Sequence, residues 1–284
     1  MAKLLKGKDV VESLNAKLAE QVSKLNADGI TPTLAILRVG EREDDLSYER
    51  GAKKRCEQVG VLVKVVALPM DVTEEEYLSE LDKLNNDLTV NGILMFRPLP
   101  KHIDEMKARN MLAAEKDVDG CTDLSLAGVF TNTELGFAPC TAEAAMEILK
   151  FYNIPLQGKK AVVIGRSLVI GRPVAMLLMH ANATVTICHT KTTDITAITR
   201  DADIVVVASG QMESVGKEYL SQGQTVIDVG ISYNSEKNKL CGDVKFDEAE
   251  EIVDAITPVP GGVGGVTTSI LVKHVVEAAI RQNS

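Results

Sequence analysis

Short apolar segments alternate with amphipathic segments along the whole chain, and this alternation restricts the possible folds more than any other feature. The segments 33–40 and 160–165 are almost wholly apolar and end on a glycine, which is typical of buried strands. The segment 45–59, in contrast, has its apolar residues spaced as on one face of a helix. Strands separated by helices require crossover connections, which give parallel sheets. The sequence therefore predicts an α/β protein.

The expected elements fall into two sets. We expect helices at 10–25, 45–59 and 73–86 with strands at 33–40, 62–68 and 92–96, followed by helices at 141–152, 172–180 and 195–200 with strands at 160–165, 184–188, 203–208 and 225–230. A chain of 284 residues is long enough for two domains of about 150 residues each. We therefore predict two α/β domains, 1–140 and 141–266, with the amphipathic helix in 267–284 packing back on the first.

The charge and composition of the chain argue against several classes of function. Its 40 acidic and 31 basic residues give a net charge of −9, which is unfavourable for a nucleic-acid partner. The five cysteines are scattered without a C-x-x-C pair, so we expect no disulfide framework and no bound metal. Unbroken aliphatic runs are far shorter than the roughly 18 residues that span a membrane, and the N-terminus lacks the apolar core of a signal peptide. We expect a cytoplasmic protein without a membrane partner.

The segment 161–173 has the pattern of a nucleotide-binding turn. A strand ends at Gly165, and a helix begins near Gly171 with Pro173 in its first turn, where the missing proline N–H has no cost. Free N–H groups at a helix start bind a pyrophosphate, and ligands of parallel sheets lie beyond the carboxyl ends of the strands. The spacing G-x-x-x-x-x-G departs from G-x-G-x-x-G, so a plain tight turn remains the alternative. We expect a Rossmann-type doubly wound sheet whose cofactor contacts Gly165, Arg166, Ser167 and Gly171.

The end of the next strand bears on the choice between the two nicotinamide cofactors. About 20 residues after the glycine turn, an NAD site usually has an Asp or Glu for the ribose diol. The segment 186–192 contains no acid. Arg166, Thr190 or Lys191 could instead bind the 2′-phosphate of NADP, since arginine offers a planar fork of donors to such oxygens. We therefore predict NADP rather than NAD; His189 is equally well a phosphate contact or a histidine that caps its own loop.

Four motifs follow one another in a single order along nearly the whole chain. They are EKDVDG at 115–120, APCT at 138–141, GRSLVIGRP at 165–173 and TPVPGGVG at 257–264. Together they resemble the methylenetetrahydrofolate dehydrogenase/methenyltetrahydrofolate cyclohydrolase family. The resemblance implies a homodimer of two-domain chains with a folate cleft between the domains, in one-carbon metabolism and purine biosynthesis. It also implies hydride transfer from 5,10-methylenetetrahydrofolate to NADP, followed by addition of water to the methenyl product.

The resemblance further implies the site residues. Asp119 would hydrogen-bond the pterin ring of the folate and act with Tyr48 in catalysis, while Phe96 would line the substrate pocket. Pro260, Gly261 and Gly262 would let the backbone approach the flat ligand closely, and Ile231 would lie beside the cofactor. Hydride transfer of this kind depends mainly on how the two rings are placed. The alternative is that Asp117 and Asp119 only shape the turn before Gly120.

The chain departs from the family pattern where the cyclohydrolase lysine is usual, four residues after the tyrosine. That position is Ala52, and on a helix Lys53 and Lys54 lie about 140° and 120° away from Tyr48. Phe96 occupies the position of a glutamine that contacts this lysine, and strand alternation places Arg97 on the opposite face. A further change, Gly265-Val266 in place of Pro-Met, affects the loop over the folate. We expect a working dehydrogenase whose cyclohydrolase activity is weak or absent.

Three alternatives remain open. The chain could be fully bifunctional, with Lys53 or Arg97 reaching the site. It could be a non-catalytic protein that binds folate or a nucleotide. It could also be an NADP-dependent dehydrogenase of a shikimate-like keto acid, in which case Lys116 and Asp119 would form a proton-transferring pair.

Overall fold

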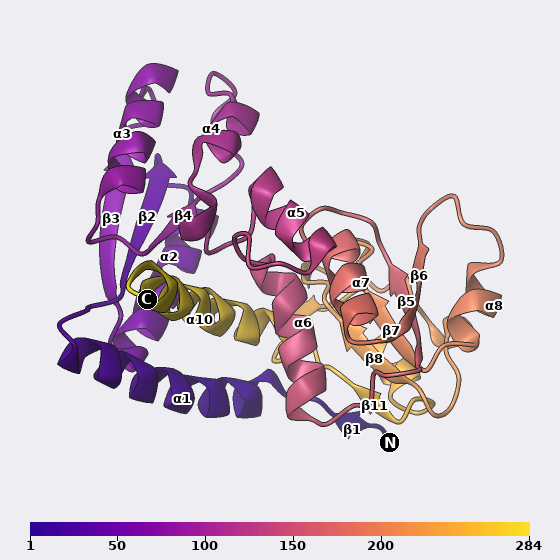
Figure 1. Cartoon of the computed structure of the whole chain (residues 1–284). Helices are drawn as coiled ribbons and strands as arrows, with labels where there is room; N and C mark the ends of the chain where they lie inside the picture. Colours follow the sequence, from indigo (N-terminus) through magenta and orange to yellow (C-terminus); the bar gives the residue numbers. More distant parts are fainter. The chain divides into compact units, whose positions relative to one another are not determined.

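A computed structural model describes all 284 residues and divides the chain into two compact units (Figure 1). Each unit is built on a parallel sheet, so the predicted architecture of two α/β domains is confirmed. The six-stranded unit comprises Met1–Glu12 and Thr141–Thr267, and the three-stranded unit comprises Ser13–Cys140 and Thr268–Ser284. The first twelve residues thus lie outside the unit that contains most of 1–140.

The three-stranded unit has its strands in the order β3-β2-β4, all parallel. The strands are β2 (Thr33–Val39), β3 (Leu62–Leu68) and β4 (Gly92–Met95), connected by the helices α2 (Glu43–Val59) and α3 (Glu74–Asn86). Further along are α4 (Glu105–Met111), the 3-10 turn η1 (Ala114–Lys116) and α5 (Asp123–Thr131), and most of α1 (Gly7–Ala27) also belongs here. Alternate residues of β2 pack against α3 and α4 in one buried cluster, which fixes the register of the central strand.

Local sequence signals explain where these helices begin and end. Thr73 accepts a hydrogen bond from the amide of Glu76, whose carboxylate accepts the Thr73 amide in return, so α3 starts with a capping box. α2 has three acidic residues in its first turn and ends at Gly60 in the left-handed conformation. The buried residues of α2 are Glu49, Ala52, Cys56 and Val59.

The six-stranded unit has the strand order β1-β11-β8-β7-β5-β6, all parallel. The strands are β1 (Lys3–Leu4), β5 (Lys160–Ile164), β6 (Thr184–Cys188), β7 (Ile204–Val207), β8 (Thr225–Asp228) and β11 (Ala255–Ile256); the other elements are α6 (Cys140–Phe151), α7 (Gly171–His180), α8 (Ile195–Arg200), η2 (Lys217–Tyr219), α9 (Phe246–Ala249) and the antiparallel hairpin of β9 (Ser232–Asn234) and β10 (Lys239–Cys241). β1 pairs with β11, which explains why the N-terminus groups with this unit. The chain crosses from β6 on one side of β5 to β7 on the other, which is where ligands of such sheets bind.

The last helix, α10 (Val263–Gln282), begins four residues earlier than the expected start at 267. Val263 and Gly264 therefore lie in its first turn, so the glycine-rich loop ends at Gly262. The length and apolar composition of α10 would suffice to cross a membrane, but 61% of its most apolar 18-residue window is buried inside the protein. Side chains such as Ile270, Leu271 and Val275 are fully buried, so α10 is a core helix.

Candidate functional site

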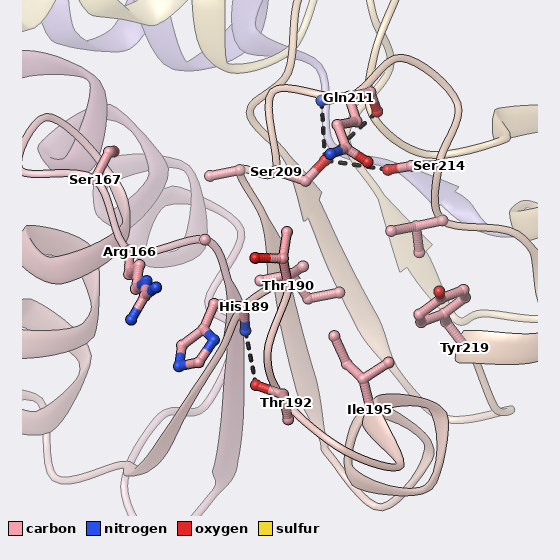
Figure 2. Close-up of a pocket in the computed structure, with 14 residues that line it drawn as sticks. Arg166, Ser167, His189, Thr190, Thr192, Ile195, Ser209, Gln211, Ser214 and Tyr219 are labelled. Atoms are coloured by element: carbon pink, nitrogen blue, oxygen red, sulfur yellow. Dashed lines mark hydrogen bonds between the residues drawn. The ribbon is translucent and has the colours of Figure 1, made fainter.

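A pocket of about 510 Å³ lies where the segments after β5, β6 and β7 meet (Figure 2). Four of the six predicted cofactor residues belong to its lining: Gly165, Arg166, Ser167 and Thr190. A Cβ on Gly165 would lie 2.2 Å from the Ala208 carbonyl oxygen, and the φ of +131° is strained for any L side chain. Gly171, at the start of α7, does not line the pocket, but its Cβ would lie 2.3 Å from the Gly165 carbonyl oxygen. Both glycines are therefore required by the tight turn itself.

Ser167 occupies the N–H groups that we expected to face a pyrophosphate. Its hydroxyl accepts hydrogen bonds from the amides of Ile170 (3.2 Å) and Gly171 (3.4 Å), while its carbonyl accepts the amide of Arg172. The next residue, Pro173, has no N–H. The expectation of free amides at the start of α7 is therefore wrong, because the serine caps that turn.

His189 both caps its loop and lines the pocket. Its amide donates to the Thr192 hydroxyl at 2.9 Å (Figure 2). Its Nδ1 accepts the amide of Lys191 at 3.1 Å. Because Nδ1 acts as an acceptor, a neutral ring carries its proton on Nε2, which is left to donate to a ligand. Lys191 itself is exposed and does not line the pocket.

The turn after β7 contributes pocket residues that the sequence analysis missed, including Ser209, Gln211 and Ser214. Buried Asp243 holds this turn, since its Oδ2 accepts the Ser209 hydroxyl at 2.9 Å and the Gly210 amide at 2.7 Å. These residues follow directly on a buried strand, so the rule that ligands bind at the carboxyl ends could have found them. Ile231, expected beside the cofactor, is 60% exposed and is not part of the lining.

The three-stranded unit brings together three of the predicted substrate residues, Tyr48, Phe96 and Asp119. Tyr48 on α2 and Phe96 after β4 form an edge-to-face pair, with 5.9 Å between ring centroids and 78° between the planes. Burial raises the pKa of Tyr48 well above its ordinary value, and the nearby thiol of Cys140 and carboxylate of Asp119 raise it further. The phenol therefore stays protonated at neutral pH and can donate a hydrogen bond.

Asp119 pairs with Arg97, a contact that the sequence analysis did not predict. The arginine Nη2 lies 3.4 Å from the Asp119 Oδ2. Arg97 also lies near Cys121, which packs with Met95 in one buried cluster, whereas Phe96 contacts helix α2. This arrangement agrees with the expected alternation. Burial raises the pKa of Asp119 to about 6, although the charge and hydrogen bond of Arg97 oppose the rise.

Asp117 and Asp119 have different roles in the structure. The fully buried carboxylate of Asp117 accepts the amides of Cys121 and Thr122 and the hydroxyl of Ser125, so it shapes the turn into α5. Asp119 makes no such bonds. The Lys116 ammonium donates to the carbonyl oxygens of Leu84 (3.2 Å) and Asp87 (2.8 Å), which leaves it unsuited to a proton-transferring pair with Asp119.

The lysines next to Ala52 are occupied or exposed. Ala52 is fully buried on α2. Lys53 donates to Glu49 at 2.5 Å, and Glu49 also accepts the Arg38 guanidinium at 2.9 Å. Burial acts to raise the pKa of Glu49, but the bonds and charges of the two cations outweigh it and lower that pKa. Lys53 is thus held in an ion-pair network, and Lys54 is exposed.

Pro260, Gly261 and Gly262 follow β11 in the six-stranded unit. The Gly261 carbonyl accepts the amide of Gly7 at 2.8 Å, and Gly261 has a φ of +102°. A Cβ on Gly262 would lie 2.5 Å from the Pro258 carbonyl oxygen. The positive φ therefore accounts for Gly261, and close backbone packing inside this unit accounts for Gly262. No group of three or more His, Cys, Asp or Glu side chains is placed to hold a metal ion.

Comparison with known proteins agrees with the motifs. Residues 5–119 match the family model of the tetrahydrofolate dehydrogenase/cyclohydrolase catalytic domain, and residues 139–283 match that of the NAD(P)-binding domain. The chain is 50% identical to a protein of Carboxydothermus hydrogenoformans named "Bifunctional protein FolD", over 98% of this chain and 97% of that one. A protein of the same name from Clostridioides difficile is 48% identical over 99% and 98% of the two chains.

Solved structures show the same relationship. The FolD methylenetetrahydrofolate dehydrogenase/cyclohydrolase of Campylobacter jejuni superposes with a TM-score of 0.95 at 37% identity, covering 99% of each chain. A Trypanosoma brucei dehydrogenase-cyclohydrolase, solved with NADP and an inhibitor, gives a TM-score of 0.90 at 36% identity over 99% and 98%. With both models matched and relatives aligned over their full length, this chain belongs to the tetrahydrofolate dehydrogenase/cyclohydrolase family.

Proposed function

We propose that this chain oxidises 5,10-methylenetetrahydrofolate with NADP and hydrolyses the methenyl product to 10-formyltetrahydrofolate. The observation that carries the proposal is the meeting of Tyr48, Phe96 and Asp119 in the unit whose sequence matches the catalytic-domain model. An aromatic wall beside a half-buried carboxylate suits a flat heterocycle that carries N–H donors. In the cell we expect a cytoplasmic homodimer that serves one-carbon metabolism and purine synthesis.

The pocket of the six-stranded unit fits NADP. Gly165 lines the pocket at the turn after β5, and Arg166 and His189 offer donors at the pocket lining. No carboxylate stands in 186–192 to favour an unphosphorylated ribose. The Trypanosoma brucei relative was solved with NADP, which supports the same choice. When bound, NADP supplies the hydride acceptor, and the protein contributes binding and orientation.

The residues of the three-stranded unit have distinct tasks in this proposal. Ionised Asp119 accepts hydrogen bonds from the pterin N–H groups and fixes the orientation of the ring. Phe96 and Tyr48 form the apolar wall, and the Tyr48 hydroxyl donates to a polar atom of the ligand. The lone pair of the folate nitrogen expels the hydride, so that placement is the main contribution of the protein.

For the second step, the comparisons favour the fully bifunctional alternative over a weak or absent cyclohydrolase. Relatives about half identical to the chain over their full length carry the name bifunctional. In hydrolysis, the water oxygen bonds to the methenyl carbon and the bond from that carbon to N5 breaks. One proton of the water is transferred to N5 and the other is released. Ala52 removes the family's lysine, but Arg97 brings a cation to the Asp119 carboxylate.

Two assays on the purified protein test the proposal. Reduction of NADP with 5,10-methylenetetrahydrofolate should be rapid and should exceed reduction of NAD. Decay of methenyltetrahydrofolate absorbance should be faster with the enzyme than without it. Oxidation without accelerated hydrolysis would restrict the function to the dehydrogenase. Ligand binding without either reaction would indicate a non-catalytic binding protein.

A further inference from the structure

Asp119 has one hydrogen-bond partner in the protein, the Arg97 guanidinium at 3.4 Å. The arginine side chain is 23% exposed and that of Asp119 25%, so both are largely enclosed but still reachable by a ligand. The Nε of Arg97 is buried and donates to nothing. A guanidinium held in this way retains unused donors, which makes its charge available to a nearby anion.

Other cations of the same unit are bound elsewhere. Lys53 is paired with Glu49, and Lys116 donates to two backbone carbonyls. Glu105, a carboxylate near Arg97, accepts the Leu99 amide at 3.0 Å. Arg97 is thus the basic side chain that directly pairs with the carboxylate expected to bind the pterin.

We propose that Arg97 is a positioning residue for the reaction, which keeps the Asp119 carboxylate ionised and oriented to accept the pterin N–H groups. This inference rests on the proposed folate-binding function. Arg97 acts through Asp119, so its loss should weaken substrate binding and change the pH dependence of binding. A lysine, which also carries a positive charge, should replace it in part.

The electrostatic surroundings of Asp119 give the sign of the effect. Burial raises its pKa to about 6, and Arg97 opposes this most strongly. Asp117, on the same segment, raises that pKa, while His274 on α10 lowers it. Tyr48 on α2 and the Cys121 thiol also face the carboxylate. Without the Arg97 charge, the pKa of Asp119 rises further and the carboxyl is protonated near neutral pH.

The test measures the KM for 5,10-methylenetetrahydrofolate against pH in the wild type, Arg97→Gln and Arg97→Lys, at saturating NADP. An opposite charge within hydrogen-bond range shifts a carboxyl pKa by about 1–3 units. Arg97→Gln should therefore raise KM about tenfold near neutral pH. At about pH 9, where Asp119 is again ionised, KM should return toward the wild-type value. The KM of Arg97→Lys should lie closer to the wild-type value than that of Arg97→Gln. Lys54→Gln removes an exposed cation of α2 and should leave the profile unchanged.

A double-mutant cycle with Asp119→Asn tests whether Arg97 acts through the carboxyl. In the Asn background, Arg97→Gln should no longer move the pH profile. An Arg97→Gln profile that superimposes on that of the wild type would overturn the inference, and so would an equal shift in the Asn background.

Titration of the Asp119 carboxyl by 13C NMR in the ligand-free protein gives a readout that does not need activity. The carboxyl should titrate at higher pH in folded Arg97→Gln than in the wild type; an unchanged titration refutes the inference. A wild-type protein that does not oxidise the folate refutes the proposed function instead, and the NMR comparison still decides the role of Arg97.

Discussion

The ring of Phe96 stands edge-on to the ring of Tyr48, with 5.9 Å between their centroids. The two residues come from different elements, the segment after β4 and the helix α2. The contact joins the end of strand β4 to the helix that carries Ala52, and it forms the apolar side of the proposed pterin pocket.

Replacing Phe96 by leucine should raise the KM for the folate by about two- to tenfold, because edge-to-face aromatic pairs contribute about 0.5–1.5 kcal/mol. Phe130→Leu is the matched control, since Phe130 is 69% exposed on α5 and should have no effect on KM. Steady-state kinetics at saturating NADP provide the measurement. Equal KM values for the two variants would show that the aromatic pair does not contribute to substrate binding.

Gly165→Ala should abolish cofactor binding and lower the free energy of unfolding by about 1–3 kcal/mol. The added methyl group would meet the Ala208 carbonyl at 2.2 Å in a backbone conformation that alanine rarely adopts. Gly158→Ala serves as the control, because Gly158 has a φ of +74° but nothing within 4 Å of the added carbon. Calorimetric titration with NADP and urea denaturation separate the two effects. Normal NADP binding by Gly165→Ala would contradict the assigned cofactor turn.

Arg166→Gln should raise the KM for NADP by about 10- to 100-fold, because hydrogen bonds to charged groups contribute about 1.5–3 kcal/mol. The KM for NAD should change much less, since NAD lacks the 2′-phosphate. Arg172→Gln removes an exposed arginine of α7 that does not line the pocket, and both KM values should then stay as in the wild type. Equal losses with both cofactors in Arg166→Gln would place the arginine elsewhere on the dinucleotide.

The two neighbouring aspartates should respond to substitution in opposite ways. Asp117→Asn should destabilise the protein by about 2–4 kcal/mol, because one of the two buried carboxylate oxygens that accept three hydrogen bonds becomes an NH2 group facing donors. Asp119→Asn should change the free energy of unfolding by less than about 1 kcal/mol, since its single ion pair is partly exposed. It should nevertheless weaken folate binding strongly. Denaturation midpoints and folate titrations of both variants test this, and a reversed pattern would contradict the assignment.

Much of the fold could be predicted, because period-two and helical patterns are strong where an element is buried on one or both faces. The strands 62–68 and 184–188 coincide with β3 and β6. The hairpin β9–β10 was missed, since polar residues surround its turn and its strands have three residues each. The start of α10 was placed late, because two glycines precede the first clearly apolar turn.

The candidate site was less accessible to sequence reasoning. Gly165 and Gly171 could be predicted from the sequence, because they lie in a strand–turn–helix pattern. The pairing of Arg97 with Asp119 was not predicted, because the strand pattern does not specify contacts between segments 22 residues apart. The capping of α7 by Ser167 depends on a hydroxyl orientation that spacing does not specify. Asp117 and Asp119 are alike in sequence, and burial distinguishes them.

The central claim is that the chain places a reduced folate against a nicotinamide ring and thereby drives its oxidation. The most direct test incubates the purified protein with 5,10-methylenetetrahydrofolate and NADP and follows formation of NADPH and of methenyltetrahydrofolate. We predict that the amount of NADPH formed equals that of methenyltetrahydrofolate and 10-formyltetrahydrofolate together, and that Asp119→Asn greatly slows the reaction at subsaturating folate. The account would be contradicted if the folded wild-type protein formed no NADPH from NADP and no NADH from NAD.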